Sequence, residues 1–397
     1  MPASAGVNAT GEKMITLRID NQAHLSPLSE LPGQAATQIK DRLIFPNPAH
    51  QEAVKRGFYA GNLPQEIKGY RVEGDALIIP RGFAAQLVAI LRGAGVQYRV
   101  EDHRRTLPEV DLTFKGELRD FQVEAVNAMA SRDFGIMSSA TGSGKTVMAL
   151  YLIAMRRQPA LVVVHTKELM DQWIARIGTF LGIPAREVGI IGNGKKRIGD
   201  KITVALVQSV YKCAGEIAPL IGYLMVDECH RAPSRTFTEA VSAFDSRYMT
   251  GLSATLFRRD GLSRLIYWYL GDKIHEVDKA ALVDAGHVLR AEVIRRMTEF
   301  EPKFDPSEEY SKMLSELTQD PARNALIASD VAREAGNGDG VCLVLSDRKA
   351  HCEALGAALL ARGVNASILT GDMGNVEGTA QHIAFNEAAH PVAHYHD

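Results

Sequence analysis

The 397-residue sequence lacks several features that would each indicate a particular class of protein. It has no apolar run near the roughly 18–20 residues that cross a bilayer, so we expect no membrane-spanning segment. Its cysteines are few and show no C-x-x-C spacing, which argues against a zinc site or a disulfide framework and favours a reducing compartment. The formal net charge is only −2, so any nucleic-acid surface must be local. The N-terminus has no apolar core of a signal peptide, and we expect a cytoplasmic protein.

Length and composition are those of a soluble globular chain with more than one domain. Apolar residues make up 46% and charged residues 23% of the sequence, which is ordinary for such proteins. A chain of 397 residues has room for two or three separate cores. The pattern of apolar residues changes near residues 108 and 290. We therefore expect a small α+β domain over 1–108, an α/β lobe over 109–289 and a second α/β region over 290–397.

The central region alternates short apolar segments with amphipathic helical patterns. This alternation is typical of a parallel sheet that helices cover on both faces. The predicted strands are 134–137, 160–164, 203–207, 223–226 and the more polar 247–250. In such folds ligands bind beyond the carboxyl ends of the strands. The chemistry-bearing segments fall at these ends: 138–146, 165–168, 227–230 and 251–255.

A glycine-bearing loop follows the first of these strands. It contains Gly142 and Gly144, runs into Lys145-Thr146, and is followed by a helical pattern over 147–155. Glycines let backbone amides turn inward together, and a helix N-terminus adds its dipole, so the loop is suited to a phosphate group. The first glycine of the pattern G-x-x-x-x-G-K-[ST] is replaced by Ser139. The alternative is a Gly/Ser turn before an unrelated lysine, but the flanking strand and helix favour a nucleotide site.

Two carboxylates, Asp227 and Glu228, come directly after the apolar strand 223–226. One fixed acid that holds Mg²⁺ and a second that polarises a water molecule are what phosphoryl transfer to water requires. The alternative is an ordinary solvated acidic pair at the end of a strand. The phosphate loop upstream favours the catalytic interpretation.

The sequence Asp227-Glu228-Cys229-His230 forms a D-E-C-H box, and with the phosphate loop it makes the chain resemble superfamily 2 DExH helicases. Segment 138–146 resembles motif I of this family, and 251–255, continuing into 258–261, resembles motif III. Other matching segments are 118–122 on the adenine side, 165–169 with Gln172-Trp173 as motif Ia, and 207–209 as a strand-binding motif. His165 stands where the family commonly has proline. The branch resembled most holds the xeroderma-type excision-repair helicases, phage recombination helicases and restriction-enzyme motors, in which Ile79-Pro80-Arg81-Gly82 would also fit.

The resemblance implies a RecA-like lobe that binds ATP and Mg²⁺, with roles carried over by position. Lys145 and Thr146 would bind phosphate and metal, Asp227 would hold the metal, and Glu228 would be the general base. The implied nucleotide-binding set is Arg119, Gln122, Thr141, Gly142, Ser143, Gly144, Lys145, Thr146 and His230. His230, Ser253 and Thr255 would couple the ATP site to a bound strand, whose backbone would contact Thr166, Lys167, Gln208 and Ser209. The basic loop 192–197 fits a phosphate contact and a solvated hairpin equally well.

The region after residue 290 predicts only part of a second RecA-like lobe. It shows two helices over 308–334 that break near Asp320-Pro321, a buried strand over 341–345, a helix over 348–361 and a strand over 366–369. It contains no counterpart of motif V and no Q-x-x-G-R-x-x-R stretch for motif VI, which would supply arginines to the γ-phosphate. We therefore expect a chain shortened in its second lobe, which binds ATP but hydrolyses it slowly unless a protein partner supplies the missing part.

Three functions remain open. The first is an ATP-dependent DNA helicase or translocase, and the second is an ATP-responsive nucleic-acid-binding module without motor activity. The third is a P-loop kinase or another NTPase, against which the segments resembling motifs Ia and III argue. The branch resembled favours DNA over RNA as the partner, and we expect no membrane association.

Overall fold

The computed structural model describes residues 14–231, 235–257, 260–286, 288–289, 292–337 and 340–370. Its contacts divide the chain into two compact units, Met1–Arg290 and Ala291–Asp397. None of the helices within the described ranges has the length and apolar character that crossing a bilayer requires.

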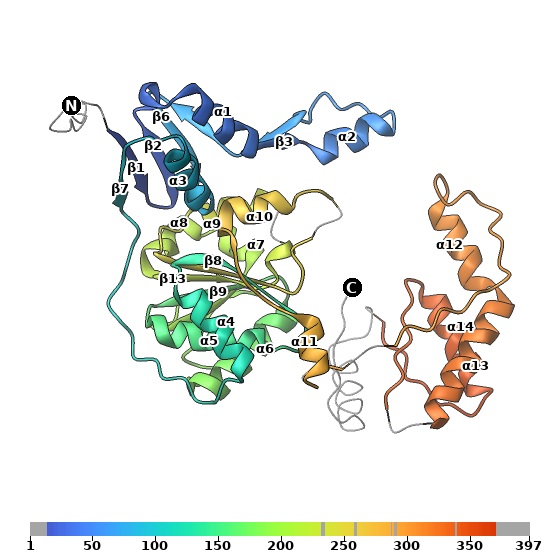
Figure 1. Cartoon of the computed structure of the whole chain (residues 1–397). Helices are drawn as coiled ribbons and strands as arrows, with labels where there is room; N and C mark the ends of the chain where they lie inside the picture. The colour runs from blue at the N-terminus through green and yellow to red at the C-terminus, as the bar shows by residue number, and fades with distance from the viewer. Residues whose placement is uncertain are drawn as a thin grey trace. The chain divides into compact units, whose positions relative to one another are not determined.

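The N-terminal part of the first unit is built on a five-stranded sheet with the order β5-β6-β2-β1-β7. Its strands are β1 (Ile15–Ile19), β2 (Gln22–Ser26), β5 (Arg71–Glu73), β6 (Ala76–Pro80) and β7 (Tyr98–Asp102). Helices α1 (Gly33–Arg42) and α3 (Ala84–Gly93) pack against it over a core that Trp268 also joins (Figure 1). The apolar residues of β1 are buried and alternate with the more exposed Thr16 and Arg18, as expected for a sheet with one buried face.

A second, two-stranded sheet carries an arm away from this core (Figure 1). Strands β3 (Ile44–Pro46) and β4 (Glu66–Lys68) pair antiparallel, and the chain between them contains α2 (Pro48–Lys55). Asn47 caps α2 by accepting a hydrogen bond from the amide of Ala49, and Pro48 occupies the first helical position. The chain therefore leaves the N-terminal core along β3 and returns to it along β4.

The turn after β6 joins the N-terminal part to the rest of the first unit. Arg81, which is almost fully buried, donates to the carbonyl of Ser246 at 2.7 Å. Gly82 lies against backbone atoms: an added Cβ would come within 2.5 Å of the Trp268 carbonyl oxygen and 2.6 Å of the Gly271 nitrogen. Such close approach of two backbones needs a residue without a side chain.

The larger sheet has eight strands in the order β11-β10-β12-β9-β13-β14-β8-β15, and all neighbours are parallel except β10 and β11. The strands are β8 (Phe134–Ser139), β9 (Ala160–Val164), β10 (Gly189–Gly192), β11 (Lys195–Arg197), β12 (Ile202–Leu206), β13 (Tyr223–Val226), β14 (Tyr248–Ser253) and β15 (Lys273–Val277). Every residue of β9 and β13 is buried, which explains why both run as continuous apolar segments. The expected α/β fold class is confirmed.

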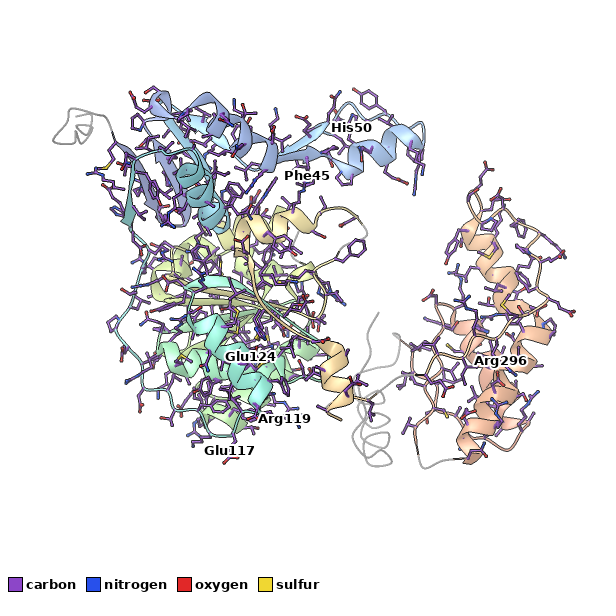
Figure 2. The ribbon with its side chains drawn as sticks, in the orientation of Figure 1. Phe45, His50, Glu117, Arg119, Glu124 and Arg296 are labelled. Atoms are coloured by element: carbon purple, nitrogen blue, oxygen red, sulfur yellow. The ribbon has the colours of Figure 1, made fainter. Side chains whose placement is uncertain are left out.

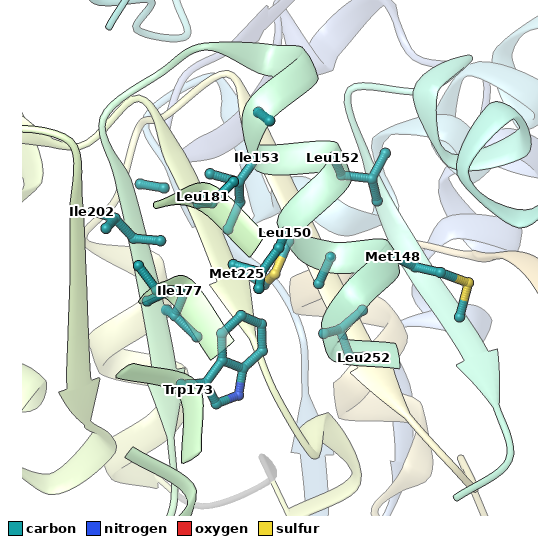
Figure 3. Close-up of a cluster of buried hydrophobic side chains, with 14 of the residues drawn as sticks. Met148, Leu150, Leu152, Ile153, Trp173, Ile177, Leu181, Ile202, Met225 and Leu252 are labelled. Atoms are coloured by element: carbon teal, nitrogen blue, oxygen red, sulfur yellow. The ribbon is translucent and has the colours of Figure 1, made fainter. Parts of the chain in front are cut away.

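Helices cover both faces of this sheet (Figure 1). One face carries α4 (Asp120–Ala130), α5 (Lys145–Arg156) and α6 (Lys167–Leu181), whose buried side chains meet those of the strands in the core shown in Figure 3. The other face carries α7 (Val207–Tyr211), α8 (Ala214–Ile217), α9 (Arg235–Ser242) and α10 (Ser263–Leu270). The chain leaves β15 through α11 (Lys279–Asp284). With helices on both sides, the backbone at the strand ends is the part of the sheet left open to a ligand.

The second unit contains α12 (Tyr310–Gln319), α13 (Pro321–Asn337) and α14 (Lys349–Leu360), which confirms the predicted helices and their break at Asp320-Pro321. The strands predicted over 341–345 and 366–369 are wrong for the described residues, since neither segment pairs with another strand. Leu343 is 61% and Leu345 69% exposed, so the segment expected to be buried is not. An apolar segment becomes a buried strand only when neighbouring strands and a covering layer enclose it.

Candidate functional site

The register of the large sheet brings the predicted site segments to one edge. Ser253 at the end of β14 pairs with Ser138 of β8, and Gly251 pairs with Val226 at the end of β13. Val226 in turn pairs with Val163 of β9. The residues that follow these strands are therefore neighbours, although they come from four separate parts of the sequence.

The loop after β8 has the backbone shape of an anion cradle. Gly142 and Gly144 have φ values of 83° and 85°, in the left-handed region where a side chain is strained. Ser139, which replaces the first glycine of the pattern, bonds through its hydroxyl to that of Ser143 at 2.5 Å. Lys145 Nζ donates to the Ser139 carbonyl oxygen at 3.0 Å and so spans the loop. Ser139 thus fits into the loop and forms hydrogen bonds with other residues of the loop.

Helix α5 begins directly at Lys145, and its first amides face the loop. The first hydrogen bond of its ladder runs from the amide of Met148 to the carbonyl of Gly144. The amides of Lys145, Thr146 and Val147 precede that ladder, and a helix satisfies such groups with an anion or with solvent. Thr146 lies in this first turn. Chemically, the loop can accept a phosphate group.

Gln122 of α4 forms a hydrogen bond to the phosphate loop. Its Nε2 donates to the Ser143 carbonyl at 2.9 Å, and its Oε1 accepts from the amide of Arg119 at 3.0 Å. A Cβ on Gly144 would come within 2.4 Å of that Nε2, so the contact depends on glycine. Gln122 is buried, whereas Arg119 and Thr141 are exposed. The structure places the predicted adenine-side glutamine directly beneath the phosphate loop.

Asp227 and Glu228 occupy the tip of β13, as predicted. Asp227 is 6% exposed, and Trp173 Nε1 donates to its Oδ2 at 2.8 Å. Its Oδ1 accepts from the amide of Glu228 at 2.9 Å. Burial raises the pKa of Asp227, while the Trp173 hydrogen bond and the charge of Lys145 act in the opposite direction. Because Lys145 also acts on the pKa of Glu228, the amine and the two acids share one electrostatic site.

Glu228 is held in an unusual conformation that points to function. Its φ is 47°, in the left-handed region that non-glycine residues seldom adopt, at a cost of roughly 1–3 kcal/mol. Burial alone would raise the pKa of Glu228, but the His230 hydrogen bond and the charge of Lys145 lower it overall. The carboxylate is therefore ionised and available as a base at neutral pH.

A chain of polar contacts leads from Glu228 to the end of β14. His230 Nδ1 lies 3.1 Å from Glu228 Oε2 and 3.0 Å from Ser253 Oγ. Ser253 Oγ donates to the Thr255 carbonyl at 2.5 Å, so it acts as the acceptor toward His230. Since a carboxylate only accepts, the proton of His230 lies on Nδ1. Arg258 and Arg259, which continue this segment, lie outside the described residues.

The four predicted strand-binding residues lie at the same edge, on the neighbouring strands β9 and β12. Leu206 of β12 pairs with Val164 of β9, so Thr166-Lys167 and Gln208-Ser209 follow adjacent strand ends. Lys167 and Gln208 are exposed, whereas the Thr166 hydroxyl caps α6 by accepting from the amide of Leu169. Because β13 is the next strand after β9 in the sheet, these residues form a second surface beside the acidic pair.

The basic loop 192–197 is a β-hairpin. Asn193 and Gly194 form its turn with φ values of 50° and 75°, as in two-residue hairpin loops. Lys196 forms an ion pair with Glu216, and both guanidinium ends of Arg197 donate to backbone carbonyls. Of the two interpretations left open by the sequence, this arrangement favours the hairpin.

Two residues of the site had no predicted role. Trp173 was part of a motif match, but its bond to Asp227 joins residues 54 positions apart. His165 directly follows β9; burial lowers its pKa to about 4, and the charges of Arg231 and His230 act in the same direction. Its Nε2 is a buried atom without a hydrogen bond among the described residues. A histidine in the place of the family's proline was the only sequence signal.

Comparison with known proteins identifies relatives for the central region. Residues 115–258 match the family described as the res subunit of type III restriction enzymes. The chain is 34% identical over 186 residues to "Probable helicase D10" of Escherichia phage T5, covering 47% of this chain and 40% of the relative. It is 38% identical over 160 residues to the DNA 3'-5' translocase XPB2 of Sulfurisphaera tokodaii, covering 40% and 36%. The chain thus spans about two fifths of the length of these curated relatives.

Solved structures show the same fold. The crystal structure of T4 UvsW matches with a TM-score of 0.52 and 15% identity, over 94% of this chain and 78% of that one. A structure of the UvsW helicase from bacteriophage T4 matches with a TM-score of 0.50 and 16% identity, over 66% of this chain and 99% of that one. The RecA-like fold expected from the sequence is confirmed.

Proposed function

We propose that the chain is an ATP-dependent DNA helicase or translocase of the superfamily 2 DExH type, which the relatives of its central region support. The observation that carries the proposal is the meeting of Lys145 with Asp227 and Glu228 at one edge of a parallel sheet. An amine on a glycine loop and two fixed acids are the groups that nucleoside triphosphate hydrolysis uses. The relative described as a DNA translocase supports DNA as the second ligand.

Each residue of this site has a defined task in the proposed reaction. The first amides of α5 and the Lys145 ammonium would bind the β- and γ-phosphates. The Thr146 hydroxyl and the Asp227 carboxylate are oxygen ligands of the kind that Mg²⁺ prefers, and the metal would neutralise phosphate charge. Glu228, ionised and oriented by His230, would accept a proton from the attacking water. Trp173 keeps the Asp227 carboxylate in place.

The nucleic-acid surface lies next to the ATP site in the proposal. Lys167 and Gln208 are exposed at the ends of β9 and β12, where they would contact a phosphate backbone without reading its sequence. Through the contacts from Glu228 to His230 and from His230 to Ser253, hydrolysis of the nucleotide would change the position of residues at this edge. We also assign residues 1–108 to an accessory DNA-binding domain.

The proposal is tested by nucleotide binding and turnover of the full chain. Wild type should bind a fluorescent ATP analogue with Mg²⁺, and Lys145→Ala should lose this binding while its circular dichroism spectrum stays unchanged. Lys167→Ala, the matched control, removes a lysine from the same sheet edge and should weaken only DNA binding. Full nucleotide affinity in Lys145→Ala would contradict the site.

We propose that the second unit limits hydrolysis. Residues 290–397 contain no Q-x-x-G-R-x-x-R stretch, and arginines that reach the γ-phosphate accelerate related reactions about 10³–10⁵-fold. Turnover of this chain should therefore stay below about one per second, under the usual range of enzymes. We also propose that a protein partner covers the exposed Leu343 and Leu345. Rapid DNA-stimulated turnover of the purified chain would refute this part.

The second candidate function is an ATP-responsive clamp on nucleic acid without motor activity. It is favoured by segments 341–345 and 366–369 of the second unit, which pair with no strand in the part of the chain that the structure describes. A strand-displacement assay separates the two: a clamp changes its DNA affinity with ATP but displaces no strand. We further propose a cytoplasmic location, from the scattered cysteines, and a role in DNA repair, from the branch of relatives.

A further inference from the structure

Gln122 uses both ends of its side-chain amide for hydrogen bonds inside the protein. Its Oε1 accepts from the amide of Arg119, which caps the N-terminus of α4. Its Nε2 donates to the Ser143 carbonyl at 2.9 Å. Gln122 is 6% exposed, whereas Arg119 just before α4 and Glu124 within it, both labelled in Figure 2, are exposed. The amide of Gln122 is therefore fixed by the protein and almost closed to solvent.

A glutamine that recognises adenine needs both ends of its amide for the base. The side-chain oxygen accepts from N6 and the nitrogen donates to N7, which discriminates against other bases by about 1–3 kcal/mol. The resemblance to helicases implies this role for Gln122. In the structure each end of the amide already bonds to the backbone, and the remaining N–H and lone pair belong to a side chain that is 6% exposed. Little of this amide is left for a base.

The bond from Gln122 fixes the direction of an amide in the phosphate loop. The Ser143 carbonyl and the Gly144 N–H belong to one planar trans peptide unit, so they point in opposite directions. Because the carbonyl is turned toward Gln122, the Gly144 N–H is turned away from α4. It donates to no atom in the part of the chain that the structure describes. This N–H directly precedes α5 and joins the first amides of that helix as a donor for an anion.

The Ser143 carbonyl depends on this donor. Ser143 is 2% exposed, and both its hydroxyl and its amide donate to the Ala140 carbonyl, at 2.6 Å and 3.2 Å. A buried carbonyl that loses its donor costs free energy, so without Gln122 the peptide unit would turn toward another partner. The Gly144 N–H would turn with it and leave the phosphate site. Gln122 therefore acts on the phosphates through the backbone of the loop.

We propose that Gln122 is a positioning residue that orients the Gly144 amide toward the phosphates, and that the site takes nucleoside triphosphates whatever their base. The inference rests on the proposed function and adds the substrate class to it. Affinity comes from the triphosphate with Mg²⁺ and not from the adenine, so ATP is one of several nucleotides that the site accepts. This role differs from the one that the resemblance implies, in which the glutamine reads the base.

The test compares three ligands on the full chain in the presence of Mg²⁺: ATP, GTP and inorganic tripolyphosphate, each competing with a fluorescent ATP analogue. Wild type should bind ATP and GTP within about fivefold of each other, which is less than 1 kcal/mol. Gln122→Ala should weaken the binding of all three ligands by the same factor, at least tenfold, about 1.4 kcal/mol. A glutamine that reads adenine would instead change the affinity for ATP alone.

Two further variants separate positioning from the stability of α4. Ala128→Gly places a glycine inside the same helix, away from the loop, and destabilises the helix by about 1 kcal/mol. It is the matched control and should bind all three ligands like wild type. Gln122→Glu keeps an oxygen for the Arg119 amide but loses the amide donor to Ser143, so it should bind all three ligands more weakly than wild type. Circular dichroism confirms that each variant is folded.

Four outcomes would overturn the positioning role and leave the proposed function standing. They are loss of ATP binding alone in Gln122→Ala, wild-type affinity in Gln122→Glu, equal losses in Gln122→Ala and Ala128→Gly, and a wild-type preference for ATP over GTP above about fivefold. The last needs no variant, so it decides the matter even if Gln122→Ala does not fold. Failure of the wild type to bind any of the three ligands would reject the proposed function itself.

Discussion

The bond between Trp173 and Asp227 gives the sharpest test of how the site is held. The indole Nε1 donates to a carboxylate oxygen at 2.8 Å, and both residues are nearly fully buried. Trp173→Phe removes this donor and keeps an aromatic ring in the core shown in Figure 3. The Asp227 oxygen would then lack a partner in a place that water reaches poorly.

The magnitude follows from the chemistry of the bond. A hydrogen bond to a charged group contributes about 1.5–3 kcal/mol to stability. Replacing Trp by Phe also leaves a small cavity, and Trp268→Phe measures that cost separately. Trp268 is 4% exposed, and its side chain packs through its ring on Phe45 and Gly69. We therefore expect Trp173→Phe to lower the free energy of unfolding by about 1.5–3 kcal/mol more than Trp268→Phe does.

The assay is urea unfolding followed by circular dichroism, with Mg²⁺-dependent ATP-analogue binding measured on the same proteins. If Asp227 is the metal ligand, Trp173→Phe should weaken binding in Mg²⁺ more than binding in EDTA. Equal destabilisation by the two Trp→Phe changes, within about 0.5 kcal/mol, would show that the bond does not stabilise the carboxylate. Unchanged Mg²⁺ dependence would argue against a role for this bond in positioning Asp227.

Two further predictions concern pH and packing. Burial lowers the pKa of His165 to about 4 from an ordinary 6.5, so between these values the unfolded state binds a proton that the folded state does not bind. The free energy of unfolding should therefore fall as the pH drops from about 6.5 to about 4, and it should fall less steeply in His165→Asn. Urea midpoints measured across this pH range would show the difference. Gly82→Ala forces a Cβ against backbone atoms 2.5–2.7 Å away and should destabilise by about 1–3 kcal/mol, whereas Gly93→Ala, with no atom within 4 Å, should be neutral in the same thermal melts.

Continuous apolar segments were the part of the fold that the sequence predicted best. Strands 160–164 and 223–226 have the predicted bounds, because a strand buried on both faces contains only apolar residues. Strand β15 was not predicted, since Lys273, His275 and Glu276 lie on an edge strand and remain partly solvated. Segment 341–345 was wrongly predicted to be a strand. It has the composition of a strand, but whether it pairs depends on partner strands that its composition does not show.

The site was predictable wherever a role depends on a local pattern. The phosphate loop and the acidic pair each combine a strand end with a fixed spacing, so their residues could be named in advance. The bonds of Trp173 to Asp227 and of Gln122 to Ser143 depend on which side chain reaches another element, 54 and 21 residues away. Such contacts follow from helix packing and cannot be inferred from spacing within a motif.

The same reasoning explains why the arm could not be connected to the ATP site before the structure was known. Ser253 contacts His230, which orients Glu228, and the chain then continues from β14 into α10. Trp268 of α10 seats the arm through Phe45, a residue from the other end of the first unit. A shift of Ser253 on nucleotide binding would therefore act on both the acidic pair and the root of the arm. If ATP and DNA both shift this packed segment, each changes the affinity for the other by the same factor.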